Sequence, residues 1–200
     1  CIDELAGVVG LKEQVAAITA RAMNGEIEFE PALRERVALL KGLSASVVKD
    51  VIREKITLTP GARELVQTMR KNGAHTALVS GGFTAFTAPM AAMIGFDENR
   101  ANILLAENGV FTGYVAEPIL GKEAKLEALV DICARLGLSA EDSIAVGDGA
   151  NDLLMLKAAG AGVALHAKPS VAAEAKIRLN FSDLTGLLYL QGYRKTEFAG

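Results

Sequence analysis

The first 55 residues place hydrophobic side chains at the three- and four-residue steps of a helix. A first stripe ends at Asn24-Gly25, and a second begins after Pro31. Ser44 has the side chain of a helix cap and precedes a third stripe. We therefore predict three helices and no strand in this part of the chain. The stripes consist of Val8, Leu11, Val15, Ile18 and Ala22, of Leu33, Val37 and Leu40, and of Val47, Val48, Val51 and Ile52.

The pattern changes near residue 57, where short apolar runs begin to alternate with helical stripes. The runs at residues 74–80, 143–146 and 161–165 predict strands, and Asn108-Gly109 predicts a hairpin. Strands that alternate with helices are typical of parallel βαβ units. The sequence thus predicts an α/β fold: a doubly wound, mostly parallel sheet with a β-hairpin over residues 57–200, and a small helical cap over residues 1–56. The helices expected in the core cover residues 61–72, a segment ending at Gly95, residues 123–136 and 153–159, and a segment after Pro169.

Composition narrows the class of protein. Half of the 200 residues are hydrophobic and the formal net charge is −3, so a core can form but there is no basic surface for nucleic acid or an anionic membrane. No apolar stretch approaches the roughly 20 residues that span a bilayer. Of the two cysteines, Cys1 and Cys133, the second is expected to be a packed thiol. Because no disulfide framework is indicated, we expect a cytoplasmic protein.

Two glycines follow the strand predicted at residues 74–80. Ser80-Gly81-Gly82 combines a hydroxyl group and flexible backbone with the start of a predicted helix just beyond it. Exposed N–H groups and the positive end of a helix dipole suit a phosphate group. A plain turn after a strand explains the same residues equally well.

A denser polar cluster, Gly147-Asp148-Gly149-Ala150-Asn151-Asp152, follows the strand predicted at residues 143–146. Asp148 offers the hard oxygen that Mg²⁺ prefers together with water and substrate phosphate. Asn151 is suited to donate to a substrate oxygen, and Asp152 to be a metal ligand or to support one. A helix start capped by Asn151 is the alternative. A dinucleotide-binding Gly-x-Gly-x-x-Gly loop is excluded, because Asp152 takes its last position and repels a pyrophosphate.

Lys122 and Lys125 lie between these motifs, at the start of the helix predicted at residues 123–136. A lysine there is usually a solvated charge, but a cation is unfavourable near a helix N-terminus. This mild penalty favours the interpretation that one of the two faces an anion. Ligands collect beyond the carboxyl ends of the strands of an open parallel sheet, so we expect a metal and phosphate site there.

The order Ser-Gly-Gly, Lys and Gly-Asp-Gly-x-Asn-Asp on this scaffold resembles the haloacid dehalogenase superfamily of phosphatases. Residues 79–83 and 146–152 carry the likeness to the superfamily as a whole. The cap, around Arg36, is similar to the branch that hydrolyses phosphoserine, and this likeness extends over essentially the whole chain. The cap segments that carry it are residues 2–5, 18–25 and 33–40.

The resemblance implies a phosphoryl transfer in two steps. An aspartate attacks the phosphorus of a small phosphomonoester, L-phosphoserine, and water hydrolyses the resulting phosphoaspartyl intermediate, as in serine biosynthesis. Mg²⁺ is the implied cofactor. It and fixed donors would neutralise the phosphoryl oxygens, so that most of the catalysis would be positioning and electrostatics.

The residue roles follow from the same resemblance. Arg36, in the cap, would clamp the substrate carboxylate, a task that suits its forked guanidinium. Met23 and Phe29 would close the site with apolar surface, although their helical spacing alone favours the core. The remaining roles are phosphate binding by Ser80 and Gly81, a catalytic role of Lys125 in holding together the charges of phosphate and nucleophile, Mg²⁺ binding by Asp148 and substrate contact by Asn151.

The sequence departs from the family pattern in one respect. The family places its nucleophile and general acid–base in an Asp-x-Asp-x-Thr/Ser motif just before the cap, followed by a Glu that reads the substrate amine. No Asp-x-Asp occurs in these 200 residues. Asp3 and Glu4 belong to the predicted cap helix and do not replace it. We therefore expect the nucleophile to lie before Cys1, and the chain as printed to be inactive.

Other interpretations share these residues. A related phosphatase for phosphohomoserine or phosphocholine would have the same motifs, and a non-catalytic phosphate-binding relative would lack the nucleophile. A receiver-like phosphorylation module has no place for the helical cap and the hairpin. His75 and His166 have no metal-binding partner at a useful spacing and are expected to be structural. The run at residues 184–193 predicts a helix that packs on the sheet or on a second copy of the chain, as in a homodimer.

Overall fold

The structure of the protein is a computed structural model that describes residues 2–23, 26–121 and 123–199. Its contacts divide the chain into two compact units. The chain first crosses from one unit to the other between residues 57 and 58, near the predicted boundary. The division into cap and core stays a prediction. Within the described ranges, no helix is long and apolar enough to cross a bilayer. The first unit consists of Cys1–Thr57, Ser80–Ala92 and Asn99–Gly121, and the second of Leu58–Val79, Met93–Glu98 and Lys122–Gly200.

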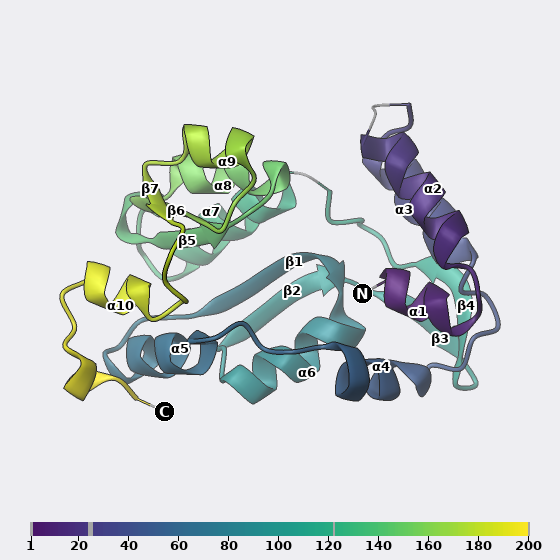
Figure 1. Cartoon of the computed structure of the whole chain (residues 1–200), viewed down its shortest axis with the longest axis horizontal. Coiled ribbons are helices and arrows are strands. Elements are labelled where there is room, and N and C mark those ends of the chain that lie inside the picture. Colours follow the sequence, from purple (N-terminus) through teal and green to yellow (C-terminus); the bar gives the residue numbers. More distant parts are fainter. Residues whose placement is uncertain (1, 24–25, 122, 200) are drawn as a thin grey trace. The chain divides into compact units, whose positions relative to one another are not determined.

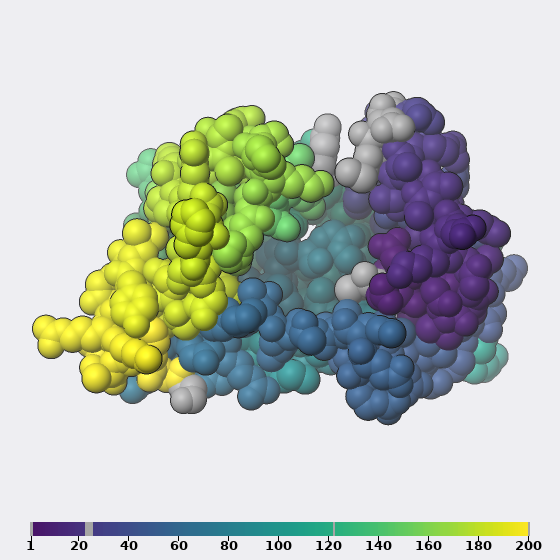
Figure 2. Space-filling model, in the orientation of Figure 1, coloured from purple at the N-terminus to yellow at the C-terminus, as the bar shows by residue number. Residues whose placement is uncertain are grey.

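Four helices and a hairpin build most of the first unit (Figure 1). Helices α2 and α3 lie side by side, and α1 contacts both α2 and α4. All four bury side chains in one hydrophobic cluster, which Phe83 and Phe86 join from later in the chain. Atoms of α1 and α2, in purple, form part of the surface in Figure 2, in keeping with their many exposed residues. The helices are α1 (Ile2–Val8), α2 (Lys12–Met23), α3 (Phe29–Ala38) and α4 (Val47–Lys55).

Two details of the predicted helices are wrong. The single helix expected over the first 22 residues is broken into α1 and α2 near Gly10, whose φ of +73° lies in the left-handed region that glycine adopts without strain. Ser44 does not cap α4, because Ser46 occupies the N-cap position. The backbone of Ser44 instead forms an isolated bridge with Val110. This contact between segments distant in sequence outweighs the local preference of serine for a helix start.

Strands β3 (Leu104–Glu107) and β4 (Val110–Val115) form an antiparallel hairpin, which confirms the prediction from Asn108-Gly109. The two turn residues have φ values of +50° and +80°, as a two-residue turn of this kind requires. Phe111 is buried in the cluster of the first unit, whereas Tyr114, on the other face of β4, is largely exposed. The hairpin therefore contributes one apolar face to this unit.

The strand predicted at residues 74–80 is displaced along the chain. Strand β1 (Ala77–Phe83) begins three residues later and continues through Ser80-Gly81-Gly82, and helix α6 (Thr84–Ile94) follows it directly. We expected the two glycines to end the strand. Strand β2 (Glu98–Asn102), which the sequence did not predict, pairs with β1, and β1 runs on through both glycines. Ser80 and Gly81 thus lie inside a strand rather than in a turn after it.

The second unit contains a parallel sheet in the order β5-β6-β7. Helix α8 packs against β5 and β6, and a buried cluster that includes Ala145, Leu156 and Val171 lies between sheet and helices. The α/β class is confirmed, although the described strands form three small sheets. The elements are α5 (Ala62–Lys71), α7 (Ala124–Arg135), β5 (Ile144–Gly147), α8 (Leu153–Ala158), β6 (Ala161–Leu165), α9 (Pro169–Glu174), β7 (Ile177–Leu179) and α10 (Gly186–Leu190), with single 3-10 turns at Ala140–Asp142, Ala150–Asp152 and Lys195–Glu197.

The helix predicted at residues 184–193 is the short helix α10. Its Leu187 and Leu188 are buried, and it contacts α5. Gly186, its first residue, lies beside Leu179 at the end of β7, as expected for a helix that packs on the sheet. Tyr189 stacks against Phe198 beyond the helix, with ring centroids 5.1 Å apart. The second copy of the chain considered for this helix stays a prediction.

Candidate active site

The loop after β5 is organised around one buried carboxylate. Asp152 is 1% exposed, and its Oδ2 accepts hydrogen bonds from the backbone N–H groups of Asp148 (3.0 Å) and Gly149 (2.9 Å). These are the free donors at the start of the 3-10 turn Ala150–Asp152. The alternative interpretation, in which Asn151 caps this start, is therefore wrong. The side chain of Asp152 accepts these two hydrogen bonds instead.

Lys125 joins this carboxylate from the first turn of α7. Its Nζ donates to Oδ1 of Asp152, and the two side chains are only 17% and 2% exposed. A buried carboxylate needs such a partner, since an unpaired charge in the interior is very costly. We predicted that one of the two lysines at this helix start faces an anion, and for Lys125 one such anion is the carboxylate of Asp152. An ammonium group has three N–H donors, so this contact leaves Lys125 able to bind a further anion. Lys122, the other candidate, lies outside the described residues.

The glycines of the loop make room for Asp152. A Cβ atom at Gly147 would lie 2.5 Å from the Cβ of Asp152, and one at Gly149 would lie 2.7 Å from Oδ1 of Asn151. Neither approach is possible without moving the loop. The groups for which these two glycines leave room are thus side chains of the loop itself.

Asp148 is the carboxylate that remains for a metal ion. Its side chain is exposed and, among the described residues, engages in no recorded hydrogen bond or ion pair. Both oxygens of Asp152 accept hydrogen bonds from the protein, which favours a supporting role over the other predicted role, that of a metal ligand. No group of three His, Cys, Asp or Glu side chains in the described part of the chain could by itself hold a metal. One free carboxylate fits Mg²⁺, which commonly takes one or two carboxylates and completes its shell with water and phosphate oxygens.

Ser80 and Gly81 lie in the first unit, in β1. The hydroxyl Oγ of Ser80 accepts a hydrogen bond from the backbone N–H of Gly82 at 3.0 Å. The carbonyl oxygen of Gly81 accepts one from Nδ2 of Asn102 at 3.1 Å. A Cβ at Gly81 would come within 3.9 Å of Cζ of Phe29, so the aromatic ring predicted to close the site does lie near this glycine. The side chain of Met23 lies outside the described residues.

Arg36 is half-buried in α3 of the first unit. Its Nε donates to the carbonyl oxygen of Ala32 at 3.1 Å, and Nη1 lies 3.4 Å from Oγ1 of Thr19. Burial lowers the pKa of Arg36 from its ordinary value, and the nearby carboxylate of Asp3 opposes that shift. An arginine stays charged in proteins, so the guanidinium is a partly desolvated cation with unused donors. Such a group favours a carboxylate ligand.

The predicted site residues therefore fall into two groups. Arg36, Ser80 and Gly81 belong to the first unit, and Lys125, Asp148 and Asn151 to the second. Within the second group, the structure brings Lys125 into contact with Asp152, and the backbone of Asp148 with the same carboxylate. Sequence reasoning missed Asn102, and it named Asp152 as a metal ligand or its support but not as the cap of the loop. Nothing in the sequence pattern marked Asn102 as a residue that supports the glycine segment.

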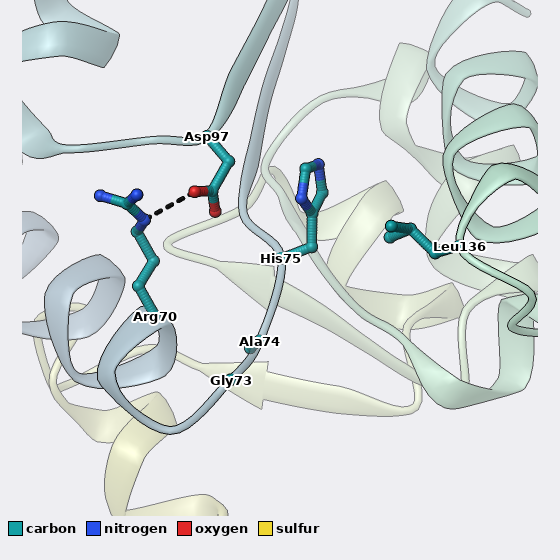
Figure 3. A pocket seen from close by; sticks show the side chains of 6 residues that line it. All are labelled: Arg70, Gly73, Ala74, His75, Asp97 and Leu136. Atoms are coloured by element: carbon teal, nitrogen blue, oxygen red, sulfur yellow. Dashed lines mark hydrogen bonds and ion pairs between the residues drawn. The ribbon is translucent and has the colours of Figure 1, made fainter.

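A separate hollow of about 370 Å³ in the second unit contains none of the predicted site residues (Figure 3). Nε of Arg70 binds Oδ1 of Asp97 at 2.7 Å beside it. Nε2 of His75 lies 3.2 Å from Oε2 of Glu98, which also pairs with Arg135. These pairs link neighbouring segments of the unit, in line with the structural role expected for His75. The hollow is lined by Arg70, Gly73, Ala74, His75, Asp97 and Leu136.

Two other residues were expected to be structural. Cys133 is buried in α7, and burial, together with the charge of Asp142, raises the pKa of its thiol. A thiol of this kind is protonated and unreactive at neutral pH, as expected for a packed cysteine. His166 follows β6, is exposed and has a φ of +44°. Its backbone N–H donates to the carbonyl oxygen of Leu179 at 3.0 Å, so its main chain helps to join β6 and β7.

Comparison with known proteins identifies relatives over nearly the whole chain. The family of haloacid dehalogenase-like hydrolases matches residues 6–157. A phosphoserine phosphatase of Polaromonas is 44% identical over 195 residues, which cover 95% of this chain and 83% of that protein. The crystal structure of a probable phosphoserine phosphatase from Vibrio cholerae matches with a TM-score of 0.90 and 39% identity, over 96% of this chain and 59% of that one. A substrate-bound phosphoserine phosphatase matches with a TM-score of 0.84 and 40% identity, over 94% and 90% of the two chains.

Proposed function

The chain belongs to the haloacid dehalogenase-like hydrolases, and we propose that it provides the phosphate-, metal- and substrate-binding residues of a phosphatase that hydrolyses L-phosphoserine to serine and phosphate. The observation that carries the proposal is the arrangement around Asp152. This carboxylate fixes the loop that presents Asp148 and holds the ammonium group of Lys125 beside it. A free carboxylate and a cation on one rigid support suit a phosphate monoester with a divalent metal ion. The similarity to phosphoserine phosphatases over 95% of the chain supports the substrate.

We infer the following division of labour. Lys125 stabilises negative charge on the phosphoryl group and on the attacking carboxylate, and Asn151 contacts a substrate oxygen. Asp148 would hold Mg²⁺, which neutralises charge on the phosphoryl oxygens when bound. The Ser80 hydroxyl and the Gly81 backbone bind the phosphate in the first unit. Because these groups act on charge that develops during transfer, they favour the transition state more than the substrate.

Arg36 is the residue proposed to select the substrate. Its guanidinium is half-buried and keeps unused donors, and a carboxylate can pair with it through two hydrogen bonds. L-phosphoserine carries such a carboxylate and phosphocholine does not. Phosphohomoserine keeps the carboxylate but places it one methylene further from the phosphate. The first alternative function, a phosphatase for one of these two esters, thus differs from the proposal in what Arg36 binds.

The attacking aspartate completes the proposed mechanism. It forms a bond to phosphorus while the serine oxygen leaves with the bonding electrons and takes a proton, and water then releases phosphate from the phosphoaspartyl group. We expect this residue outside the 200 residues printed, which contain no Asp-x-Asp. The second alternative, a phosphate-binding relative without a nucleophile, would lack it altogether. A cytoplasmic enzyme of serine biosynthesis is the setting that fits the proposal.

The test compares the complete product of the gene with the 200-residue chain. Both are assayed for phosphate release from L-phosphoserine, phosphohomoserine and phosphocholine, with Mg²⁺ and with a chelator. We expect the complete product to be fastest on L-phosphoserine, to need Mg²⁺ and to lose activity in the variant Asp148→Asn, and the 200-residue chain to be inactive. Phosphate release from none of the three esters would contradict the phosphatase proposal.

The variant Arg36→Ala tests which substrate the site selects. Because it removes the proposed carboxylate clamp, we expect KM for L-phosphoserine to rise by about tenfold or more while the rate with phosphocholine stays unchanged. Arg34→Ala is the matched control, since Arg34 is an exposed arginine on the same helix that pairs with Glu117. Equal effects of the two variants, or an unchanged KM in Arg36→Ala, would refute the assignment of Arg36.

A further inference from the structure

Asn102, the last residue of β2, is a buried polar residue without a role so far. It is 2% exposed, and among the described residues only Thr68, Asn102 and Asp152 are polar or charged and buried to this degree. Burying an amide is unfavourable unless its polar atoms are paired. The partners of Asn102 therefore show which parts of the backbone need it.

The amide of Asn102 joins two backbone segments of the first unit. Nδ2 donates to the carbonyl oxygen of Gly81 at 3.1 Å and lies 3.4 Å from that of Leu120, and Oδ1 accepts from the backbone N–H of Leu120 at 2.8 Å. An amide supplies two N–H donors and an acceptor, so this orientation satisfies all three partners. The reverse orientation would set its oxygen against two carbonyl oxygens. Neither Asp nor Leu can replace these contacts.

A planar peptide group carries the effect of Asn102 towards Ser80. The carbonyl of Gly81 and the N–H of Gly82 belong to the same peptide unit, which is rigid and close to flat. Fixing the direction of the Gly81 carbonyl therefore also fixes the direction of the Gly82 N–H. That N–H donates to Oγ of Ser80 at 3.0 Å. Asn102 thus reaches the Ser80 hydroxyl through one peptide group and two hydrogen bonds.

The two glycines make this support necessary. Without a Cβ atom, Gly81 and Gly82 have access to far more backbone conformations than other residues, so their local sequence does not fix the peptide plane. Strand β2 lies beside β1 (Figure 1) and supplies the contact that does. Leu120, the other partner, stands next to Gly121, where the first unit ends.

We propose that Asn102 is a positioning residue that orients the Ser80 hydroxyl for the phosphate group of the substrate, acting through the Gly81–Gly82 peptide. This inference rests on the proposed function, in which Ser80 binds the phosphate. Asn102 itself touches neither substrate nor metal in it. A residue of this kind affects binding of phosphate and transfer of phosphate only as long as the Ser80 hydroxyl is present.

A double-mutant cycle on the complete gene product tests this dependence. Asn102→Asp keeps the size of the side chain but removes both donors, and Ser80→Ala removes the hydroxyl. Affinity for inorganic phosphate with Mg²⁺ is measured by titration calorimetry, and kcat and KM on L-phosphoserine are measured separately. We expect Asn102→Asp to weaken phosphate binding and kcat/KM by about tenfold or more, and to have much less effect in the Ser80→Ala background. Additive effects of the two changes would overturn the proposal.

Thr68→Val provides the matched control for a purely structural loss. Thr68 is as buried as Asn102, and its Oγ1 accepts a hydrogen bond from the backbone N–H of Ala199 at 2.8 Å in the second unit. Urea unfolding of both variants gives their stabilities. We expect both to lose stability and only Asn102→Asp to lose phosphate affinity. Equal phosphate affinities in the two variants would contradict a positioning role. If Asn102→Asp does not fold, the smaller, neutral Asn102→Ser takes its place in the cycle.

Hydrogen exchange separates this inference from the proposed function. The backbone amide of Gly82 is followed by NMR in the wild type and in Asn102→Asp, with the amides of α5 as reference. We expect exchange at Gly82 to accelerate at least about tenfold relative to that reference. Unchanged exchange would refute the inference whether or not the protein hydrolyses phosphoserine. A wild type that neither hydrolyses phosphoserine nor binds phosphate, with faster exchange at Gly82 in the variant, would refute the proposed function and confine Asn102 to backbone support.

Discussion

The loop at residues 147–152 and the segment Ser80-Gly81-Gly82 are both proposed to bind one phosphate group, yet their conformations depend on different parts of the chain. The loop contains its own support, since the carboxylate of Asp152 accepts from two N–H groups three and four residues earlier. The glycine segment receives its support from Asn102, which lies 21 residues beyond Gly81. One conformation is thus mainly local, and the other depends on a neighbouring strand.

The two supports differ in charge, and this difference determines what else each one brings to the proposed phosphate site. A carboxylate within the loop also attracts a cation, and so brings Lys125 to the same place. An amide from another strand adds no charge, so in the proposed site the Ser80 segment would bind phosphate through N–H groups and a hydroxyl, without a charged side chain. We expect the loop to be sensitive to charge and the glycine segment to be sensitive to geometry.

Removing Asp152 should have the largest effect. Asp152→Ala leaves the ammonium group of Lys125 buried without its partner and two N–H groups of the loop without an acceptor, so we expect a loss of about 3 kcal/mol or more in the free energy of unfolding. Urea unfolding at neutral pH measures it. Lys157→Ala is the control, because Lys157 forms an exposed ion pair with Glu174 in the same unit, and we expect it to change stability by less than about 1 kcal/mol. Similar losses in the two variants would show that the Asp152 carboxylate is not the support of this loop.

Crowding the loop should have the next largest effect. A Cβ at Gly147 would lie 2.5 Å from the Cβ of Asp152, so Gly147→Ala must displace that side chain, and we expect a loss of about 1–3 kcal/mol. Gly121→Ala is the matched control, since nothing lies within 4 Å of the added atom there. Thermal unfolding of both variants gives the comparison. A Gly147→Ala protein as stable as Gly121→Ala would mean that the loop has another conformation of similar free energy.

The contrast between local and distant support also explains which features could be predicted from the sequence. The loop at residues 147–152 could be recognised as a candidate site because its proposed metal ligand, its glycines and its support all lie within six residues. The hairpin at Asn108-Gly109 was predicted correctly for the same reason, since a two-residue turn is specified by its own residues. The sequence did not identify Asp152 as the cap, because Asn151 and Asp152 are both suitable residues and the direction of a side chain is not visible in a pattern.

Contacts between distant residues account for the rest of the errors. Gly81 and Gly82 read as the end of a strand, whereas β1 continues through them and lies beside β2. Strand β2 itself, Glu98–Asn102, has charged and polar residues at most positions and gives no apolar alternation. Ser44 was misread as a cap because its bridge to Val110 lies far away in the sequence. Asn102 was missed because a polar residue becomes informative only when it is known to be buried.

The smallest effect is expected at Asp97, a carboxylate outside the proposed site that accepts a hydrogen bond from the backbone of Thr76. Its Oδ2 accepts from the N–H and the hydroxyl of Thr76, both at 2.8 Å, and its Oδ1 binds Arg70. Partial burial acts to raise the pKa of Asp97, but the bonds from Thr76 and the charge of Arg70 outweigh it and hold the pKa below its ordinary value. A carboxyl group with a lowered folded-state pKa stabilises the protein above its unfolded-state pKa and loses this effect as the pH falls through the folded-state value.

We therefore expect Asp97→Asn to lower the free energy of unfolding by about 1 kcal/mol at pH 7. The difference from the wild type should shrink as the pH falls below about 4, where the carboxyl group of the unfolded wild type takes up its proton first. Urea unfolding at a series of pH values measures both. Asp97 supports its turn as Asp152 supports the loop, but its cation is the exposed Arg70 and not a buried lysine, so the two losses compare a carboxylate paired at the surface with one paired in the interior. A loss in Asp97→Asn as large as that in Asp152→Ala would show that burial of the Lys125 pair adds nothing to the stability of the loop.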